Sequence, residues 1–331
     1  MKTHVEPAHT KAELAHAVES AVYLLSGAFP VALPTETVYG LAGWALNRDA
    51  LFRIYTTKDR PKFDPLIVHI PTMEWLDNLC AISPEDRPLI DRLTAAFWPG
   101  PLTIILPRKP VVPDLVTSGL PTVAIRMSAH PVFKEVIENF GQPLAAPSAN
   151  RFGRVSPTAA KHVLDELGGR INLIVDGGPT QHGVESTIVT VRRDHLWILR
   201  NGPVTSEELA RHANVAVAAS PSRPIAPGQL KSHYAPTTPL RLLPPGEPPF
   251  QAVPAPVGLL AFCSSENTGH FQSVEVLSRQ GDLREAASNL FNKLRFLDAL
   301  GLKQIVVESV PETGLGAAIM DRLRKAAAAH E

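Results

Sequence analysis

The 331-residue sequence contains only two cysteines, Cys80 and Cys263, which lie far apart and outside any CxxC pattern. This scarcity argues against a disulfide framework or a cysteine-based zinc site and favours a reducing compartment. The formal net charge is zero, whereas a protein that binds nucleic acid over its whole surface is usually basic. An anionic ligand would therefore have to bind at a local cluster of positive charge.

The sequence also lacks a long apolar run near its N-terminus. Residues 1–20 show no signal-peptide pattern, and the uncharged stretch 20–35 is broken by glycine and proline and is too short to span a bilayer. We therefore expect a soluble cytoplasmic protein with no membrane segment. No Walker P-loop, HExxH or G-x-S-x-G motif is present, so the nucleophile of an enzymatic reaction would come from a substrate.

Proline is abundant and unevenly distributed. Apolar residues make up 44% of the chain and charged residues 19%, which is typical of a globular protein, and the length predicts two domains. Of the 32 prolines, 11 fall within 219–256, where they disfavour regular structure. We expect a first domain over 1–217, a proline-rich linker over 218–256 and a small second domain over 257–331.

Helix and strand patterns alternate before the linker. A capping box at Thr10–Glu13, followed by apolar residues at helical spacing, predicts a helix that ends at Gly27. Further helices are predicted over 130–140 and 157–167, the second opened by Ser156 and Pro157. The apolar runs of strand length are FPVALP, PLIVHI, PLTIILP, TVAIRM, NLIVDGG, STIVTV and LWILR. This mixture predicts one α/β domain built on a large twisted sheet.

The region after the linker has the pattern of a small α/β unit with a parallel, Rossmann-like sheet. It contains VGLLAF, a helix near 282–300, the strand QIVVES and a last helix from about 315. GLGAAI at 314–319 resembles a dinucleotide fingerprint, but Ile319 stands where glycine or alanine is expected. We therefore favour a tight turn into a helix over a nucleotide site there.

Polar residues gather at the ends of the predicted strands. PTETVYGLAG at 34–43 follows a strand, and strand ends that open into glycine turns are where α/β proteins bind ligands, although a polar turn with satisfied hydroxyls is the alternative. KDRPKFDPLIVH groups two lysines and an arginine, including Lys58 and Arg60, which suits a polyphosphate. A solvated charged turn would look the same. His69 ends this segment, and such a histidine is more often a satisfied core residue than a catalyst.

Two further segments carry polar side chains in apolar surroundings. Arg126 lies inside the strand TVAIR, where its charge requires either an ion-pair partner or a bound anion. In PLAAPSAN, Ser148 and Asn150 follow an extended stretch, so the turn can present hydroxyl, amide and backbone N–H groups, as an ordinary turn also would. GVESTIV and ILRNGP are predicted to pair as antiparallel strands that bring Ser186 and Arg200 together; a surface arginine at a strand end is the alternative.

Taken together, these segments resemble the threonylcarbamoyl-AMP synthase family, whose catalytic domain is YrdC-like. PTETVYGL, KxRPxxxPLIVH, FWPGPLT, TVAIR, PSAN, ESTIV and ILRxG occur in family order over roughly residues 10–205. HYAP at 233–236 and the C-terminal GLGAAIMDRLRKAA match the long form with a second domain. The resemblance implies a large open mixed sheet with flanking helices, and a deep, positively lined cleft for ATP and threonine. The implied reaction converts L-threonine, bicarbonate and ATP to threonylcarbamoyl-AMP and pyrophosphate, for tRNA threonylcarbamoyladenosine modification.

The resemblance also assigns site residues. The threonine site would comprise Thr37, His69, Arg126, Ala146 and Ser186. The ATP site would comprise Lys58, Arg60, Asp64, Thr122, Ser148, Asn150, Ser156, Arg200 and Tyr234. Of these, Lys58, Arg60 and Arg200 are the catalytic candidates. The chain departs from the family pattern at Asp64, where asparagine is frequent, at Ser128, where proline is frequent, and at Thr190, where aspartate is frequent.

The mechanism expected from these residues is adenylation by positioning. The amine of threonine captures carbon dioxide or bicarbonate, and the carboxylate so formed attacks the α-phosphorus of ATP while fixed cations stabilise the phosphate oxygens. Mg²⁺ is expected with ATP, bridging phosphates, and no metal held by protein side chains is expected. Arg126 would clamp the threonine carboxylate. Tyr234, in the linker, would close over the site as a lid, or would merely anchor the linker.

The expected partners are downstream tRNA threonylcarbamoyl-transfer proteins, with tRNA itself a further candidate and no membrane. Two alternative functions stay open. One is an RNA-binding module without catalysis, although the zero net charge and the lack of aromatic stacking motifs count against it. The other is a carbamoyl-transfer maturation enzyme, which would be expected to carry cysteine-rich or acylphosphatase-like segments that this sequence lacks.

Overall fold

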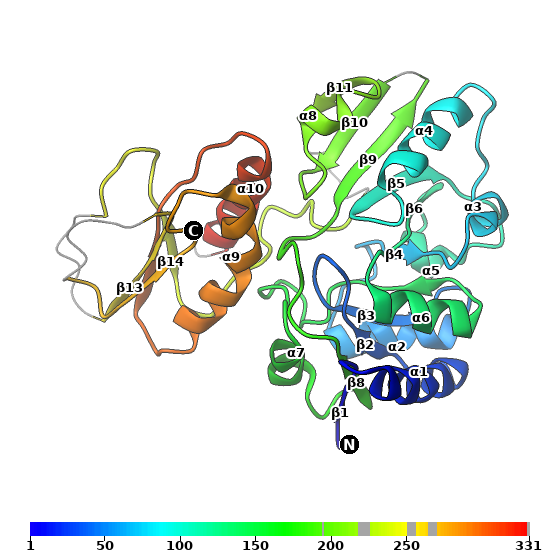
Figure 1. The fold of residues 1–331 in the computed structure, drawn as a ribbon, viewed down its shortest axis with the longest axis horizontal. Coiled ribbons are helices and arrows are strands. Elements are labelled where there is room, and N and C mark those ends of the chain that lie inside the picture. Colours follow the sequence, from blue (N-terminus) through cyan, green and yellow to red (C-terminus); the bar gives the residue numbers. More distant parts are fainter. Residues whose placement is uncertain (194, 218–225, 250–255, 264–269, 330–331) are drawn as a thin grey trace.

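The computed structural model consists of two packed α/β units of unequal size (Figure 1). Among the described residues, an eleven-stranded sheet forms the first unit and a four-stranded sheet forms the second. The predicted fold class, a large mixed sheet with flanking helices and a small Rossmann-like unit, is therefore confirmed. The structure describes residues 1–193, 195–217, 226–249, 256–263 and 270–329.

The first sheet has the strand order β1-β8-β2-β3-β7-β4-β6-β5-β9-β10-β11. In that order, its strands are His4–Pro7, Leu173–Asp176, Val31–Leu33, Gly40–Trp44, Leu144–Ala145, Ile67–His69, Thr122–Arg126, Leu102–Pro107, Thr187–Arg192, His195–Arg200 and Asn214–Val217. β4 is parallel to β6, β5 is antiparallel to β6, and β9 is parallel to β5. The C-terminal ends of β4 and β6 therefore lie beside the N-terminal ends of β5 and β9.

Each apolar run predicted as a strand contains one, but several strands were not predicted. The clearest case is β3, whose sequence GLAGW was interpreted as part of a glycine turn. It pairs with β2 on one side and β7 on the other. Its glycines serve close packing, because a Cβ on Gly43 would lie 2.9 Å from Cδ1 of Ile54 in the neighbouring helix. Small residues in this strand thus reflect the tight approach of a helix.

The predicted first helix is confirmed as α1, Lys11–Ser26, with the capping box at Thr10 and the end at Gly27. It packs against α6, Pro131–Phe140, through a shared apolar cluster that includes Ala21 and Val136. The other helices of the first unit are α2 Arg48–Lys58, α3 Glu74–Leu79, α4 Arg87–Phe97, α5 Asp114–Thr117, α7 Ala160–Leu167 and α8 Ser206–Leu209.

The predicted start of α7 was wrong, because the helix begins at Ala160 and not at Pro157. Long-range contacts hold the preceding residues in an extended path. The carbonyl of Pro157 accepts a hydrogen bond from the backbone N–H of Tyr39 at 2.8 Å. The hydroxyl of Ser156 donates to Oε1 of Glu185 at 2.5 Å. These residues therefore join distant segments instead of opening the helix.

The second unit has an entirely parallel sheet in the order β12-β15-β13-β14. Its strands, in that order, are Leu240–Leu242, Gln304–Val307, Val257–Ala261 and Ser273–Val276, and its helices are α9 Leu283–Asp298 and α10 Leu315–Ala327. Gly314, with φ of 52°, precedes α10, so the tight turn favoured for GLGAAI is confirmed. β12 lies within the predicted linker range, of which 218–225 and 250–255 fall outside the described residues.

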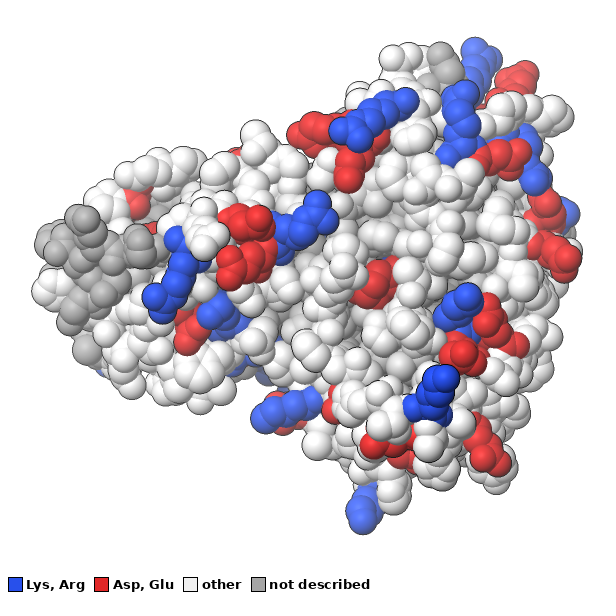
Figure 2. All heavy atoms as spheres, viewed as in Figure 1, with Lys and Arg blue, Asp and Glu red and all other residues white. Residues whose placement is uncertain are grey.

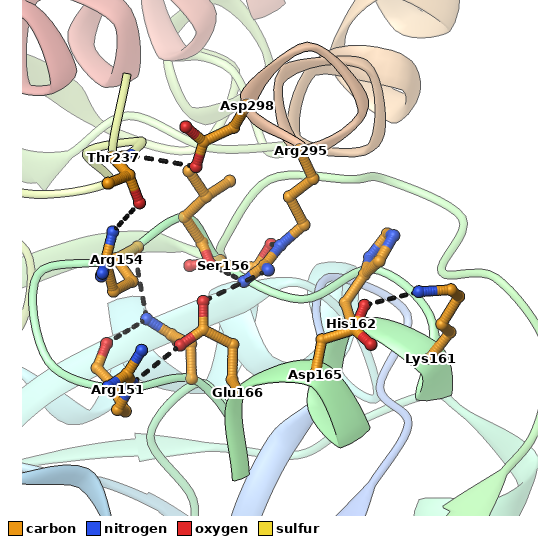
Figure 3. Close-up of polar contacts among 12 residues, drawn as sticks. Arg151, Arg154, Ser156, Lys161, His162, Asp165, Glu166, Thr237, Arg295 and Asp298 are labelled. Carbon is orange, nitrogen blue, oxygen red and sulfur yellow. Dashed lines mark hydrogen bonds and ion pairs between the residues drawn. The ribbon is translucent and has the colours of Figure 1, made fainter. Parts of the chain in front are cut away.

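Helices α9 and α10 lie between the second sheet and the first unit (Figure 1). One apolar cluster combines Val38 and Val184 of the first unit with Phe291 and Ile319 of these helices. Figure 3 shows the polar contacts at this interface, where Arg295 of α9 pairs with Glu166 of α7 at 3.3 Å. The two units therefore share a packed interface.

Charges of both signs are interspersed over the face shown in Figure 2, in keeping with the zero net charge. In the part of the chain that the structure describes, we find no helix with the length and apolar character needed to cross a membrane.

Candidate functional site

A cleft lies where several strands of the first sheet end. Its walls come from the turn after β2, the C-terminal ends of β4 and β6, the turn after β7, the start of β9 and the end of β10. Segment 227–234 closes one side. The crevice at the carboxyl ends of parallel strands is a general ligand site in α/β sheets. All five residues predicted for threonine line this cleft: Thr37, His69, Arg126, Ala146 and Ser186.

Arg126, at the end of β6, is buried and bound from three directions. Its Nη2 pairs with Oε1 of Glu36 at 2.7 Å, its Nη1 donates to Oγ1 of Thr37 at 3.0 Å, and its Nε donates to the carbonyl of Gly100 at 3.2 Å. The structural ion pair considered from the sequence is thus present. Nε and Nη1 each donate one hydrogen bond, and Nη2 makes only the ion pair, so N–H groups of this guanidinium remain for a ligand.

Glu36 compensates the charge of Arg126. Burial would raise the pKa of this carboxyl, but the charge of Arg126 and a 2.5 Å hydrogen bond from the hydroxyl of Ser128 outweigh burial and lower the pKa to about 2. Glu36 is therefore ionised at neutral pH. Ser128, at a position where the family often has proline, thus stabilises the partner of Arg126.

His69 is a neutral side chain in this site. Burial, together with the charge of Arg126, lowers the pKa of His69 to about 3, although Glu36 opposes the shift. Its ring packs on Phe133 with 4.6 Å between centroids. Nδ1 has no hydrogen-bond partner among the described residues, so a polar atom of this buried ring is available to a ligand.

The cationic residues line the side of the cleft toward segment 227–234. Arg60 pairs with Oδ2 of Asp64 at 2.9 Å and donates to the carbonyl of Pro65 at 2.8 Å. Arg200 donates from Nε to the carbonyl of Ser186 and from Nη2 to its hydroxyl, both at 3.0 Å. The predicted antiparallel pairing of β9 and β10, and the meeting of Ser186 and Arg200, are confirmed.

Lys58 lies behind the cleft wall. Its Nζ donates to the carbonyl of Ser148 at 2.5 Å and to the carbonyl of Asn150, which ties the end of α2 to the PSAN turn. Burial lowers the pKa of this amine well below its usual value. Ser148 lines the cleft, whereas Asn150 is buried and donates to the carbonyls of Arg151 and Arg154.

The other residues predicted for ATP have different surroundings. Asp64 and Ser156 are buried behind the cleft lining, the first against Arg60 and the second against Glu185. Thr122 begins β6 and Arg126 ends it, so the two share one sheet face but lie about 13 Å apart along the strand. Thr122 does not line the described cleft. The ATP-binding roles of these residues stay predictions.

Tyr234, from the HYAP segment, lines the cleft and is buried. Its backbone has φ of 62°, a left-handed conformation that costs a non-glycine residue about 1–3 kcal/mol. The ring stacks on Phe291 of α9 at 5.7 Å, and Cζ of Arg322 of α10 lies 5.3 Å from its centroid. The second unit therefore holds this residue in place.

Sequence reasoning missed two charged residues of the site, Glu185 and Arg322. Nε of Arg322 pairs with Oε2 of Glu185 at 2.9 Å, and both are buried. A signal was available for the arginine, because it shares helical spacing with Leu315, Ile319 and Ala326, all of them apolar and buried. A lone arginine in such a row indicates a buried partner.

Comparisons with known proteins agree with this geometry. The family described as telomere recombination matches residues 24–202, and the family described as threonylcarbamoyl-AMP synthase, C-terminal domain, matches residues 204–328. The threonylcarbamoyl-AMP synthase of Bacillus subtilis is 42% identical over 326 residues, covering 94% of this chain and 92% of the relative. That of Pyrococcus abyssi is 41% identical over 310 residues, covering 89% of both.

Among solved structures, Sua5 of Pyrococcus abyssi in complex with L-threonine superposes with a TM-score of 0.88 at 35% identity, covering 99% of this chain and 98% of that one. YciO of Escherichia coli, at a TM-score of 0.51 and 19% identity, covers 60% of this chain and shares its fold. The matches over nearly the whole length show that this chain belongs to the threonylcarbamoyl-AMP synthase family.

Proposed function

We propose that the cleft described above is where this enzyme converts L-threonine, bicarbonate and ATP to threonylcarbamoyl-AMP and pyrophosphate. The observation that carries the proposal is the convergence of two residue sets on one cleft. Thr37, His69 and Arg126 lie on one side, Arg60 and Arg200 lie on the other, and Ser186, which Arg200 contacts, lies between them. A threonine held on the first side would have its amine and carboxylate within reach of a nucleotide on the second.

Arg126 would bind the carboxylate of threonine. Its remaining N–H groups would donate to the carboxylate, and the contacts with Glu36 and Thr37 fix the plane of the guanidinium. The low pKa of His69 keeps its imidazole neutral at physiological pH, so it would accept or donate a hydrogen bond without a charge of its own. Ser186 would contribute its hydroxyl between the two sides of the cleft.

The reaction would need no nucleophile from the protein. The amine of threonine forms an N–C bond with bicarbonate, and water is lost to give an N-carboxy carboxylate. An oxygen of that carboxylate then bonds to the α-phosphorus of ATP as the bond to pyrophosphate breaks. Arg60 and Arg200 would stabilise the charge on the phosphate oxygens, and Lys58 would support the turn that carries Ser148.

Mg²⁺ would enter with ATP. Within the described residues, no group of three or more histidine, cysteine, aspartate or glutamate side chains is placed to hold a metal ion. The carboxylate of Asp64 is paired with Arg60. Mg²⁺ bound with ATP would neutralise charge on the phosphates.

The product would pass to proteins that transfer the threonylcarbamoyl group to tRNA in the cytoplasm, with tRNA itself a candidate partner. The two alternative functions, RNA binding without catalysis and carbamoyl-transfer maturation, are not favoured, because the relatives that match most of this chain are named threonylcarbamoyl-AMP synthases.

Pyrophosphate release tests the proposed function. Wild-type protein with ATP and Mg²⁺ should release pyrophosphate only when threonine and bicarbonate are both present, and one threonylcarbamoyl-AMP should form for each pyrophosphate. Release at the same rate with both omitted would indicate a plain ATP pyrophosphohydrolase and would overturn the proposal.

A further inference from the structure

A buried carboxylate lies within the cationic side of the cleft. Glu185 lines the cleft directly before Ser186. Arg200 donates hydrogen bonds to the backbone carbonyl and to the hydroxyl of Ser186. Burial would raise the pKa of Glu185, but the charges of Arg322 and Arg200 outweigh burial, so the pKa is lowered and the group is ionised. An ionised carboxylate in this place would compete with a phosphate for Arg200 unless another cation held it.

That other cation comes from the second unit. Arg322 of α10 is 1% exposed, and its Nε donates to Oε2 of Glu185 at 2.9 Å. Its Nη1 donates to the carbonyl of Asn201 and to Oδ2 of Asp321, both at 2.8 Å. A helix of the second unit therefore places a fully buried guanidinium against a carboxylate of the first-unit cleft.

The three arginines that line the cleft differ in their partners. Arg60 is paired with Asp64, and Arg126 is paired with Glu36. Among the ion pairs of the described residues, none includes Arg200, whose donors contact the carbonyls of Ser186 and Pro227 and the hydroxyl of Ser186. Its positive charge is therefore not matched by a carboxylate of its own.

We propose that Arg322 is a positioning residue for the nucleotide: by holding Glu185, it keeps that carboxylate away from Arg200 and leaves Arg200 free to bind the phosphates of ATP. This inference rests on the proposed function and extends it, because it makes the second unit part of the ATP site. Without the positive charge of Arg322, Glu185 would pair with Arg200, the other arginine whose charge acts on this carboxylate and which lines the same cleft, at the expense of ATP.

Calorimetric titrations of the full chain with ATP and, separately, with threonine test this inference. Arg322→Met should weaken ATP about tenfold to hundredfold, the scale of a charge-assisted interaction, and should leave threonine affinity within about threefold. Adding Glu185→Gln to Arg322→Met should recover most of the lost ATP affinity, because the competing charge is gone. Arg324→Met is the matched control on the same helix, since Arg324 is half-exposed and pairs with Glu312, and it should match wild type.

Unchanged ATP affinity in Arg322→Met would overturn the inference. Equal loss of both ligands with no recovery in the double variant would also overturn it, because Arg322 would then be a merely structural residue. If Arg322→Met is too unstable to titrate, Glu185→Gln is compared with the double variant: affinities within about threefold support the inference, and a further tenfold loss contradicts it. Wild-type protein that binds ATP but releases no pyrophosphate would instead count against the proposed function.

Discussion

The two sides of the cleft are assembled in different ways. On the threonine side, Arg126 and His69 come from neighbouring parallel strands, and the counter-charge Glu36 comes from the turn after β2, all within the first unit. On the nucleotide side, Arg200 is in the first sheet, but Tyr234 and Glu185 are held by α9 and α10 of the second unit. One side is therefore complete within one unit, and the other depends on the contact between units.

The two sides are therefore sensitive to changes in different parts of the molecule. A change at Arg126 or Glu36 should lower both the threonine affinity and the stability of the fold, because these two buried residues compensate each other's charge. A change in α10 should lower the ATP affinity and leave the threonine affinity unchanged.

The largest effect is expected on stability when the threonine side is broken. Arg126→Met leaves the buried carboxylate of Glu36 without its cation, and breaking a buried pair in this way costs about 3–5 kcal/mol. Urea unfolding would measure it, and Arg126→Met with Glu36→Gln should recover part of the loss. A loss below about 1 kcal/mol in the single variant would show that the pair is not desolvated as described.

A smaller effect is expected in the pH dependence of stability. His69 is neutral when folded, with a pKa of about 3, while the unfolded histidine takes up a proton below its ordinary pKa of 6.5. Its stabilising contribution is therefore present above pH 6.5 and is lost as the pH falls toward 3, by about 2 kcal/mol between pH 7 and pH 5. The contribution of Glu36 to stability has the same sign, but it is lost only as the pH falls from 4.5 to about 2, below this window.

Unfolding of wild type and His69→Gln at pH 7 and pH 5 isolates this contribution. The free energy of unfolding at pH 7 minus that at pH 5 should be smaller by about 2 kcal/mol in the variant than in wild type. An unchanged difference would mean that His69 is protonated in the folded protein at pH 5.

The smallest effect is expected at the Tyr234 hydroxyl. This group is buried and has no hydrogen-bond partner among the described residues, so Tyr234→Phe should leave the free energy of unfolding nearly unchanged. If the hydroxyl binds the nucleotide, ATP affinity should fall about threefold to tenfold, as expected for one neutral hydrogen bond, with threonine unaffected. Parallel titrations measure the ATP and threonine affinities, and an equal loss of threonine affinity would contradict the separation of the cleft into a threonine side and a nucleotide side.

Much of the first sheet could be predicted because β4, β5, β6, β9 and β10 are continuous apolar runs. β3 could not, since its glycines resemble a turn and its strand character depends on pairing with β2 and β7. The start of α7 was displaced by the contacts of Ser156 and Pro157 with distant segments. Local patterns give no account of such long-range contacts.

In the site, too, local sequence patterns could be interpreted and long-range contacts could not. Family motifs identified residues that line the cleft, including Arg126 and Arg200, because each lies at a strand end within a recognisable segment. The buried ion pairs of the site were not predicted, since Glu36 is far from its partner Arg126 in sequence and Arg322, the partner of Glu185, belongs to the other unit. Ion-pair partners depend on the packing of elements, which sequence spacing does not encode.

The most direct test of the division between the two sides is a pair of calorimetric titrations, with threonine and with ATP, on Arg126→Met and Arg200→Met. Arg126→Met should lose threonine affinity about tenfold to hundredfold and keep ATP, whereas Arg200→Met should show the reverse. Circular dichroism would first establish that both variants are folded. Equal losses of both ligands in both variants would contradict the account of a cleft with separate threonine and nucleotide sides.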